Sequence, residues 1–403
     1  MKKLISLFVI VALMMAMLCT TVSAEEHDAV DYIEDNVSSL ANVYAQLHPD
    51  SNEIFTGQYI EFMIPVTIVS TDSVGTYIDF DDDNGYMVLQ GRNDVIKWEV
   101  CGDLKYLKEL ENTYYSILDG FGYLEDEIFV AYEERMDNTN SITTSSPYQG
   151  QAAAGDGAIT DFNAYMNDRY SGYQFYNSDY LNTSFDYVRQ YYLSFYYYIT
   201  ESGAYESEGN CALSSIYALL NYLGASRRCD FPDKNTKGTY YPSNDSFYYL
   251  FEDDPQYYIP VSVTVPKLYY TVRQYAVERY GYRDWGLGTL ETDNVIELAA
   301  AHYQNDIDAS VHTLGSFDSF VVPELAEDDP VLIAVSNSST YGGHSMVVTG
   351  YRIYKKTTTI LGINFTDYVY LLRVNDNWSA EARYFDLTAF SGTWAYITIE
   401  VND

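Results

Sequence analysis

Cys211 is the residue whose neighbours best suit it to act as a nucleophile. It follows Asn210 at the expected start of an amphipathic helix that Gly224 ends. A cysteine at a helix N-terminus lies at the positive end of the helix dipole, which favours the reactive thiolate. Because free cysteines are more often small buried hydrophobic residues, this position alone does not make Cys211 catalytic.

His344 is the predicted base for that thiol. It stands in the run Tyr341-Gly342-Gly343-His344-Ser345, directly before an apolar stretch. The glycines allow a substrate backbone to approach closely. A thiol nucleophile is activated by a base within hydrogen-bond reach, which is the role we expect for His344. The alternative interpretation is a histidine with a structural role.

Asp376 is the candidate for a third group that orients the base. It lies in Val374-Asn375-Asp376-Asn377-Trp378, after an apolar run that ends at Val374. The base needs a partner that fixes its tautomer and orientation, and an acid at a strand end is a rigid place for one. The run Asn-Asp-Asn also favours a plain turn, which is the alternative here.

Together these residues resemble the catalytic set of papain-like cysteine peptidases of bacterial type. Their order is Cys, His, Asp, with separations of 133 residues (344 − 211) and 32 residues (376 − 344). In the papain and cathepsin branch the later residues lie roughly 130–150 positions after the cysteine. Trp378 follows Asp376 by two residues, as does the tryptophan that covers the histidine pair in this family. The run 330–351, with Gly-His-Ser before a strand, is similar to the bacteriocin-leader-processing and streptopain-like branches.

The resemblance covers residues from about 190 to 403 and implies both a fold and an activity. The fold is papain-like, with an N-terminal helical part and an antiparallel β-sheet part. The activity is hydrolysis of peptide bonds in a peptide or protein substrate, through a thiolate and an acyl-enzyme, with neither a metal nor an organic cofactor.

One position departs from the family. A glutamine that donates to the oxyanion usually stands about six residues before the cysteine, and Tyr205 occupies that place. The backbone N–H of Cys211 and the side chain of Asn210 are the candidate replacements. Losing one oxyanion donor can cost roughly 10²–10³ in rate, so an inactive relative is an open alternative.

The expected elements around these residues support an α+β domain over residues 158–403. Periodic apolar residues predict helices over 211–224, 266–280 and about 293–303. Apolar runs predict strands over 331–335, 345–349, 368–372 and 394–401. Helices followed by strands are typical of an α+β domain with an antiparallel sheet.

The first 24 residues have the pattern of a signal peptide. Lys2 and Lys3 precede an apolar run over 4–18, and Val22-Ser23-Ala24 fits a cleavage site. The run is shorter than the roughly 20 residues that span a bilayer, and no later stretch is long and apolar enough to do so. We therefore expect a protein secreted to the extracellular space or the cell surface, without a membrane span once the signal is removed.

Residues 25–136 are predicted to form a small α+β domain, and residues 137–157 a flexible linker. Apolar residues from Val30 to Leu47 recur at helical spacing, and Asp83-Asn84-Gly85 predicts a hairpin. The linker is polar and lacks any apolar period. The arrangement of the N-terminal domain loosely resembles the inhibitory prosegment of streptopain-like enzymes, which implies a zymogen. The alternative is an independent accessory domain.

Charge and cysteine content restrict the partners and the redox chemistry. The net charge of −36 becomes −38 without the two signal lysines, which argues against binding nucleic acid or an anionic membrane. Composition does not predict the oligomeric state. Cys19 leaves with the signal, so three cysteines remain and at least one stays a thiol. A disulfide between Cys101 and Cys229 would leave Cys211 as that thiol.

Two other functions fit parts of the pattern. A transglutaminase-like acyltransferase also uses Cys, His and Asp, but its Cys-to-His interval is much shorter than the one found here. A catalytically silent papain-like module that binds a surface is favoured by Tyr205 and by the 44 tyrosines of the chain.

Overall fold

The computed structural model describes most of the chain in two compact units. The described residues are 29–47, 55–69, 73–81, 85–91, 93–100, 107, 113–116, 120–125, 128–131, 156–200, 203, 205–207, 209–244, 256–280, 286–313, 317–360 and 363–402. Unit 1 comprises Met1–Val66, Ser73–Leu110 and Thr357–Thr366, and unit 2 comprises Thr67–Asp72, Glu111–Lys356 and Asp367–Asp403.

Unit 1 places two short helices against a small sheet. The helix expected between Val30 and Leu47 forms as α2 (Ala29–Asn36) and α3 (Leu40–Leu47), joined by the 3₁₀ turn η1 (Val37–Ser39). The strands are β1 (Ile60–Ile68), β2 (Ser73–Phe80), β3 (Tyr86–Gln90) and β4 (Asp94–Glu99). Ile33, Leu40 and Val43 share a buried apolar core with side chains of β2 and β3, which confirms the amphipathic pattern.

The predicted hairpin of unit 1 is present. β2 and β3 pair antiparallel, with Asp79 opposite Tyr86, and the N–H of Phe80 donates to the carbonyl of Gly85 at 3.0 Å. Gly85 has a φ of 89°, and a Cβ there would lie 1.9 Å from the carbonyl oxygen of Glu99. The turn therefore requires glycine.

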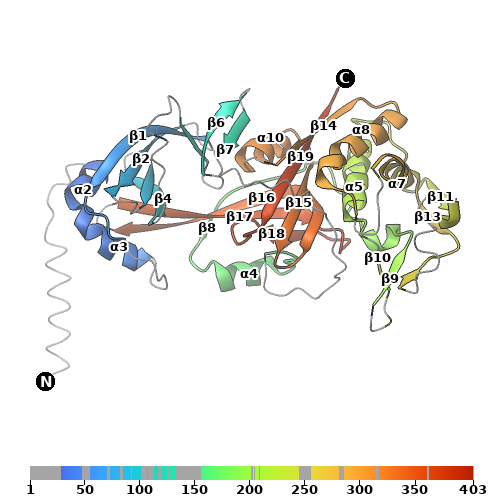
Figure 1. The fold of residues 1–403 in the computed structure, drawn as a ribbon, viewed down its shortest axis with the longest axis horizontal. Helices are drawn as coiled ribbons and strands as arrows, with labels where there is room; N and C mark the ends of the chain where they lie inside the picture. The colour runs from blue at the N-terminus through green and yellow to red at the C-terminus, as the bar shows by residue number, and fades with distance from the viewer. Residues whose placement is uncertain are drawn as a thin grey trace. The chain divides into compact units, whose positions relative to one another are not determined.

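Unit 2 is built on an antiparallel sheet with strand order β14-β19-β15-β16-β17 (Figure 1). The strands are β14 (Ile307–His312), β15 (Val331–Ser338), β16 (Gly342–Ile360), β17 (Ile363–Asn375) and β19 (Thr393–Val401). β18 (Arg383–Asp386) pairs with β17, and β8 (Gln174–Tyr180) pairs with β16. β16 and β17 are much longer than predicted, and the residues at their hairpin end, Thr357–Thr366, belong to unit 1.

Strand β15 shows how the sheet separates two apolar cores. Leu332 and Ala334 contribute to a core with three helices, whereas Val331, Ile333 and Val335 contribute to the core on the opposite face. Alternation of side chains along a strand explains why an uninterrupted apolar run is buried on both faces.

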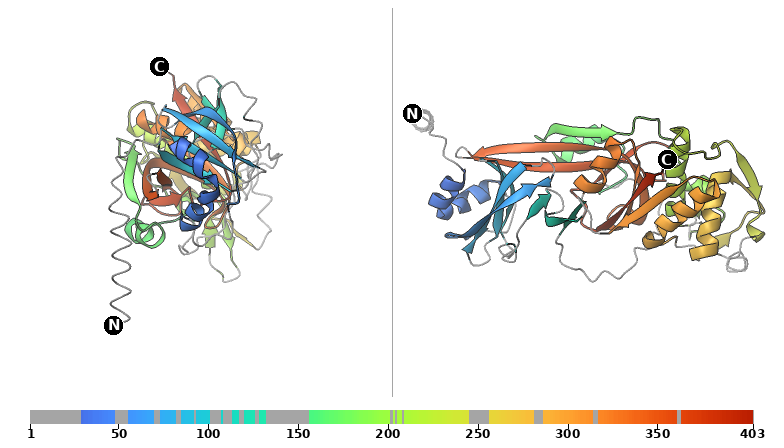
Figure 2. Two further views of the ribbon diagram at one scale, coloured as in Figure 1. Left: turned by 90° about the vertical axis from the view of Figure 1, so that its left-hand side faces the viewer. Right: turned by 90° about the horizontal axis from the view of Figure 1, so that it is seen from above.

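Three helices cover the first of these faces, and all three were expected from the sequence. They are α5 (Cys211–Ala225), α7 (Lys267–Tyr280) and α8 (Thr292–His302). Their apolar side chains form one core with Leu332, Val347 and Ile397 of the sheet. Figure 2 shows the yellow and orange helices α7 and α8 side by side in unit 2. The unit is therefore α+β, as predicted.

Shorter elements complete unit 2. They are β5 (Tyr114–Ser116), β6 (Gly120–Glu125), β7 (Ile128–Ala131), α4 (Phe162–Arg169), η5 (Gln190–Leu193), β9 (Tyr197–Ile199), β10 (Tyr205–Ser207), β11 (Lys237–Tyr240), η6 (Pro242–Asn244), β12 (Tyr257–Tyr258), β13 (Val263–Pro266), η7 (Thr289–Glu291), α9 (Phe317–Phe320) and α10 (Val322–Ala326). None of the helices in the described part of the chain combines the length and apolar character needed to cross a bilayer.

Two predicted segments fall mostly outside the described residues. The signal peptide over 1–24 lies wholly outside them, and so do residues 137–155 of the predicted linker. The last two linker positions, Asp156 and Gly157, are described, buried and hydrogen-bonded within unit 2.

Candidate active site

Cys211 is the first residue of α5, as the sequence predicted. The N–H of Ser214 donates to the carbonyl of Asn210 at 2.9 Å, which closes the first turn of the helix. Cys211 is 1% exposed and is not part of a disulfide. Cys229 is also a thiol, and Cys101 lies outside the described residues.

The first turn of α5 is attached to strand β16 beside His344. Ser215 lies four residues after Cys211, so both side chains point from the same face of the helix. The Ser215 hydroxyl donates to the carbonyl of Ser345 at 3.1 Å. The side-chain amide of Asn377 contacts the carbonyls of Cys211 (3.2 Å) and Ser345 (3.0 Å). These contacts bring the helix that starts with the thiol against the strand that carries the histidine.

Asn377 is a site residue that sequence reasoning missed. Besides the two carbonyls, its Nδ2 lies 2.8 Å from the Ser215 hydroxyl, and its own carbonyl accepts the N–H of Gln190 at 2.9 Å. Its φ of 59° is left-handed, a region that asparagine tolerates better than most residues. The run Asn-Asp-Asn predicted a turn here, but it did not predict the contacts of Asn377 with Cys211, Ser215 and Ser345.

His344 is fully buried, and its Nε2 lies 2.7 Å from the backbone carbonyl oxygen of Asp376. A carbonyl can only accept, so this contact requires the proton on Nε2. Nδ1 is then the basic nitrogen. This nitrogen is also buried. The carbonyl of Asp376 thus selects the tautomer that leaves Nδ1 able to accept a proton.

The electrostatic surroundings raise the pKa of His344 above its ordinary value of 6.5. Burial is the largest single effect and lowers the pKa, because it disfavours the charged imidazolium. The negative charge of Cys211 and a hydrogen bond to it act the other way, followed by the Asp376 carbonyl and its carboxylate. These groups together outweigh burial, so the charged imidazolium is more favoured in His344 than in a free histidine.

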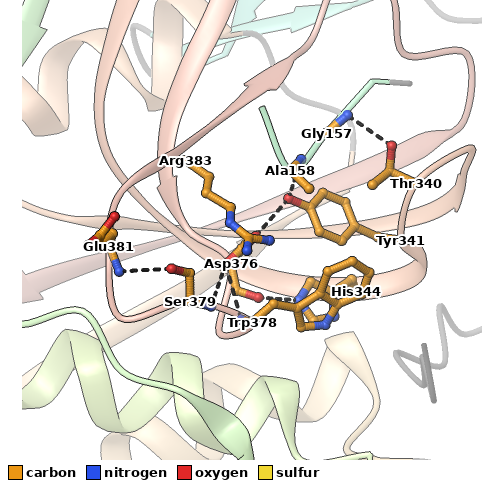
Figure 3. Close-up of polar contacts among 10 residues, drawn as sticks. All are labelled: Gly157, Ala158, Thr340, Tyr341, His344, Asp376, Trp378, Ser379, Glu381 and Arg383. Carbon is orange, nitrogen blue, oxygen red and sulfur yellow. Dashed lines mark hydrogen bonds and ion pairs between the residues drawn. The ribbon is translucent and has the colours of Figure 1, made fainter. Parts of the chain in front are cut away.

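The carboxylate of Asp376 does not face the imidazole, in contrast to the expected arrangement. Its Oδ2 accepts from the Tyr341 hydroxyl (3.1 Å) and from Arg383 (3.0 Å). Its Oδ1 accepts the N–H groups of Trp378 (3.1 Å) and Ser379 (3.2 Å) (Figure 3). A buried carboxylate is stable only when its charge is paired and its oxygens accept hydrogen bonds, and these four donors provide both. Asp376 contacts His344 through its main chain instead.

Two aromatic rings enclose the imidazole. Trp378, expected to cover the histidine, lies with its ring centre 5.4 Å from that of His344. Tyr341, which was not predicted, stacks on the imidazole with a centre distance of 5.0 Å and an interplanar angle of 8°. A parallel ring at this distance restricts how the imidazole can turn.

The side chain of Asn210 points away from the role considered for it. It makes no capping hydrogen bond to α5. Its Nδ2 instead donates to the carbonyl of Gln190 and to the hydroxyl of Tyr269, both at 3.1 Å, with the Ser194 hydroxyl at 3.4 Å. An amide has only two protons to give, and protein acceptors surround both. Asn210 therefore anchors the start of α5 to η5.

Gln190 is a second residue that sequence reasoning missed. It is buried at the start of η5, and its main chain links both sides of the site. Its N–H donates to Asn377, and its carbonyl accepts from Asn210. It lies 21 residues before Cys211 (211 − 190), whereas the family resemblance directed attention to Tyr205 at six. A search for any upstream amide, free of fixed spacing, would have included it.

A tyrosine-rich cavity of about 380 Å³ adjoins η5. Its walls are Tyr191, Tyr192, Ser194, Tyr197, Tyr258, Pro260, Ser262, Val263, Thr264 and Val265. Ser194 is shared between this cavity and the contacts of Asn210, because its hydroxyl lies 3.4 Å from the Asn210 amide. Ser194 thus connects the lining of the cavity to Asn210, the residue before Cys211.

Comparison with known proteins identifies the family of the chain. No curated protein matches the chain. The model of the Peptidase_C39 like family matches residues 183–400, which are more than half of the sequence and include Cys211, His344 and Asp376. The matched region is a mixed α+β fold with the helices and the sheet described above. The chain belongs to the Peptidase_C39 like family.

Proposed function

We propose that the chain is a cysteine peptidase that hydrolyses peptide bonds through a thioester on Cys211. The observation that carries this proposal is the attachment of the first turn of α5 to the His344 strand through Ser215 and Asn377. Membership of a peptidase family supports a peptide or protein as the substrate class.

The proposed reaction uses His344 as both acid and base. The Cys211 thiolate attacks the scissile carbonyl carbon, and the carbonyl oxygen becomes an oxyanion. The C–N bond then breaks, and the imidazolium of His344 gives its Nδ1 proton to the leaving amine. Water attacks the resulting thioester while Nδ1 takes one of its protons. The C–S bond breaks, the acid product leaves, and the thiolate and imidazolium are restored.

Asp376 and Gln190 have supporting roles in this proposal. The carbonyl of Asp376 keeps the Nε2 proton in place, so that Nδ1 is the nitrogen that exchanges a proton with the thiol. Gln190 is the candidate donor to the oxyanion, together with the backbone N–H of Cys211. Its main chain is hydrogen-bonded to Asn210 and to Asn377, the neighbours of Cys211 and Asp376, so its amide belongs to a fixed part of the site.

We further propose that the peptidase is made as a secreted zymogen. The signal pattern over residues 1–24 supports export to the extracellular space or the cell surface. The polar segment over 137–157 supports activation by cleavage, since such segments are preferred sites of proteolysis. Residues 25–136 would then suppress the enzyme until that cut is made.

A catalytically silent binding module is the second candidate, and specific observations favour it. Cys211 is 1% exposed and His344 is fully buried, so neither is presented openly to a substrate. The tyrosine-rich cavity beside η5 provides rings and hydroxyl groups for binding a peptide side chain without chemistry. In the peptidase, the same cavity would hold an apolar or aromatic side chain of the substrate.

Peptide hydrolysis separates the two candidates. The full chain and the chain cut within 137–157 are each incubated with a peptide library, alongside the Cys211→Ala variant. The peptidase predicts new peptide ends from the cut chain and none from Cys211→Ala. A cut chain that binds peptides but yields no new ends would support the silent module.

A further inference from the structure

The segment Asp156–Ala158, which we call the strap, is fixed to the turn that precedes His344. The carboxylate of Asp156 is buried and accepts three hydrogen bonds. The donors are the Ser338 hydroxyl (2.8 Å) and the N–H groups of Ser339 (3.0 Å) and Thr340 (3.1 Å). Hydrogen bonds to an ionised acceptor are roughly twice as strong as neutral ones. One carboxylate therefore holds the whole turn.

Tyr341 connects the strap to the catalytic residues. Its hydroxyl accepts the N–H of Ala158 at 2.7 Å and donates to Asp376 Oδ2 at 3.1 Å. Its ring stacks on His344 at 5.0 Å. Figure 3 shows the tyrosine between Ala158 on one side and the His344–Asp376 pair on the other. Any shift of Tyr341 would therefore disturb the imidazole and its carbonyl partner together.

The strap packs closely against the ring of Tyr341. A Cβ on Gly157 would lie 2.1 Å from Cε2 of Tyr341, so only glycine fits at this position. Ala158 has a φ of 54°, a left-handed conformation that costs energy for a residue with a Cβ. The strained residue is the one that donates to Tyr341, and its neighbours hold it there.

We propose that the strap is a positioning element of the catalytic site. Acting through Tyr341, it holds His344 between the carbonyl of Asp376 and the thiol of Cys211. Asp156 and Gly157 are the last two positions of the predicted linker, so the strap also marks where the catalytic domain begins. Cleavage before Asp156 leaves the site intact, and cleavage beyond Ala158 removes its support.

The test uses the full chain and follows the alkylation of Cys211 by iodoacetamide between pH 5 and pH 9. Peptide mapping by mass spectrometry separates this thiol from the other cysteines. Because the role of the strap rests on the proposed Cys211–His344 pairing, the readout is thiolate formation rather than peptide cleavage. A thiolate paired with an imidazolium reacts well below the free-thiol range near pH 8.5.

The variants are Gly157→Ala, which displaces the tyrosine ring, and Asp156→Ala, which releases the turn. We expect each to lower the alkylation rate at pH 6 by about tenfold or more, the effect of one pKa unit, with little change at pH 9. Asp156→Asn retains one acceptor oxygen and should have a smaller effect. Unfolding would instead expose the thiol and speed its alkylation at pH 9, so the pH profile separates misplacement from lost structure.

Asp81→Asn is the matched control. Asp81 and Asp156 are both 4% exposed, and the Asp81 carboxylate accepts the N–H groups of Gln58 and Tyr59 in unit 1. This variant should keep the wild-type profile. The strap has no positioning role if both strap variants match wild type at pH 6 while His344→Ala abolishes the reactivity at that pH. A wild-type thiol that reacts only near pH 8.5 would refute the proposed pairing, and the role of the strap with it.

Discussion

The backbone carbonyl of Asp376 lies 2.7 Å from Nε2 of His344, while the carboxylate of the same residue contacts Tyr341 and Arg383. One residue thus performs two tasks with different atoms. Its main chain sets the histidine tautomer, and its side chain secures the turn that carries that main chain. Substitutions of Asp376 leave the carbonyl in place, so their effect on the histidine is indirect.

Asp376→Ala is expected to be more harmful than Asp376→Asn. Asparagine can still accept the N–H groups of Trp378 and Ser379, whereas alanine removes every acceptor. Both substitutions leave Arg383 without its carboxylate, but asparagine keeps one oxygen that can accept a hydrogen bond. Breaking a buried ion pair costs about 3–5 kcal/mol, and because Arg383 is 21% exposed we expect less than that here.

The measurement is urea unfolding of both Asp376 variants, paired with the alkylation rate of Cys211 at pH 6. Arg383→Met in the Asp376→Ala background serves as the control, because it removes the uncompensated charge and should recover part of the stability. Equal stability of the two Asp376 variants would contradict the assigned contacts.

Cys211→Ala is expected to lower the pKa of His344. Burial opposes the imidazolium, and the charge and hydrogen bond of Cys211 are the main effects that outweigh it. Without the thiol, burial lowers the pKa of His344 with less opposition from other groups. The pKa is measured from the ring proton shifts of His344 by NMR, with His312 as the reference, since its pKa is lowered by burial alone. An unchanged His344 pKa would mean that the thiol does not act on the imidazole.

The same shift predicts how His344 contributes to stability as pH changes. Its pKa is higher in the folded protein than in the unfolded chain, so the folded state holds the proton more tightly. The stability that His344 contributes to the folded state is complete below about pH 6.5, the pKa in the unfolded chain. It is lost as pH rises through the pKa in the folded protein. In urea unfolding at pH 6 and pH 9, the stability lost between the two should be smaller in His344→Ala than in wild type.

Substitution of Asn377 is expected to destabilise the protein more than substitution of an ordinary turn residue does. Asn377→Gly keeps the left-handed backbone but loses the contacts to Cys211, Ser215 and Ser345. Asn377→Ala loses these contacts and also places a residue that disfavours the left-handed conformation at this position. We expect the glycine variant to lose about 1–3 kcal/mol of stability, because the buried Asn375 amide and the Ser215 hydroxyl each lose a hydrogen-bond partner, and the alanine variant to lose more. Thermal unfolding measures both, and a glycine variant as stable as wild type would exclude Asn377 as the anchor of α5.

The tyrosine-rich cavity is expected to influence substrate binding rather than chemistry. Tyr258→Ala removes one wall and should raise KM several-fold with little change in kcat. Tyr241→Ala is the matched control, because Tyr241 is exposed to a similar degree (53% against 47%) but does not line the cavity. Equal kinetics for the two variants would remove the cavity from the substrate site.

Activation should depend on a cut that spares the strap. Cleavage between Asp137 and Gly155 of the full chain is expected to release peptidase activity, and the C-terminal fragment should keep Asp156 at or near its new N-terminus. The measurement is activity against time during limited proteolysis, with the new N-terminus sequenced. If the uncut chain cleaves peptides as fast as the cut chain, residues 25–136 are not an inhibitory prosegment.

The sequence predicted the three helices α5, α7 and α8 and the central parts of strands β15, β16, β17 and β19, because their apolar residues follow the pattern of each element. Cys211 and His344 were identified because each is adjacent to a local signal, a helix start in one case and a glycine pair before a strand in the other. The hairpin at Gly85 followed from its turn residues in the same way.

The contacts that complete the site could not be predicted, because they join residues far apart in the chain. Tyr341 meets Ala158 across 183 positions, and Asn377 meets Cys211 across 166. Which atom of Asp376 faces His344 is decided by the competing donors Arg383, Trp378 and Ser379, and no residue pattern records that competition. Asn210 was misjudged for the same reason, since its amide partners Gln190 and Tyr269 come from other elements.

The most direct test of the central claim is to trap the acyl-enzyme. The cut chain is mixed with a cleavable peptide ester, quenched in acid within seconds, and digested for mass spectrometry. We predict a mass increase, equal to the acyl group, on the fragment that contains Cys211. The increase should disappear in Cys211→Ala. Turnover of the ester without an adduct on Cys211, or with an adduct on another residue, would contradict the assignment of Cys211 as the nucleophile.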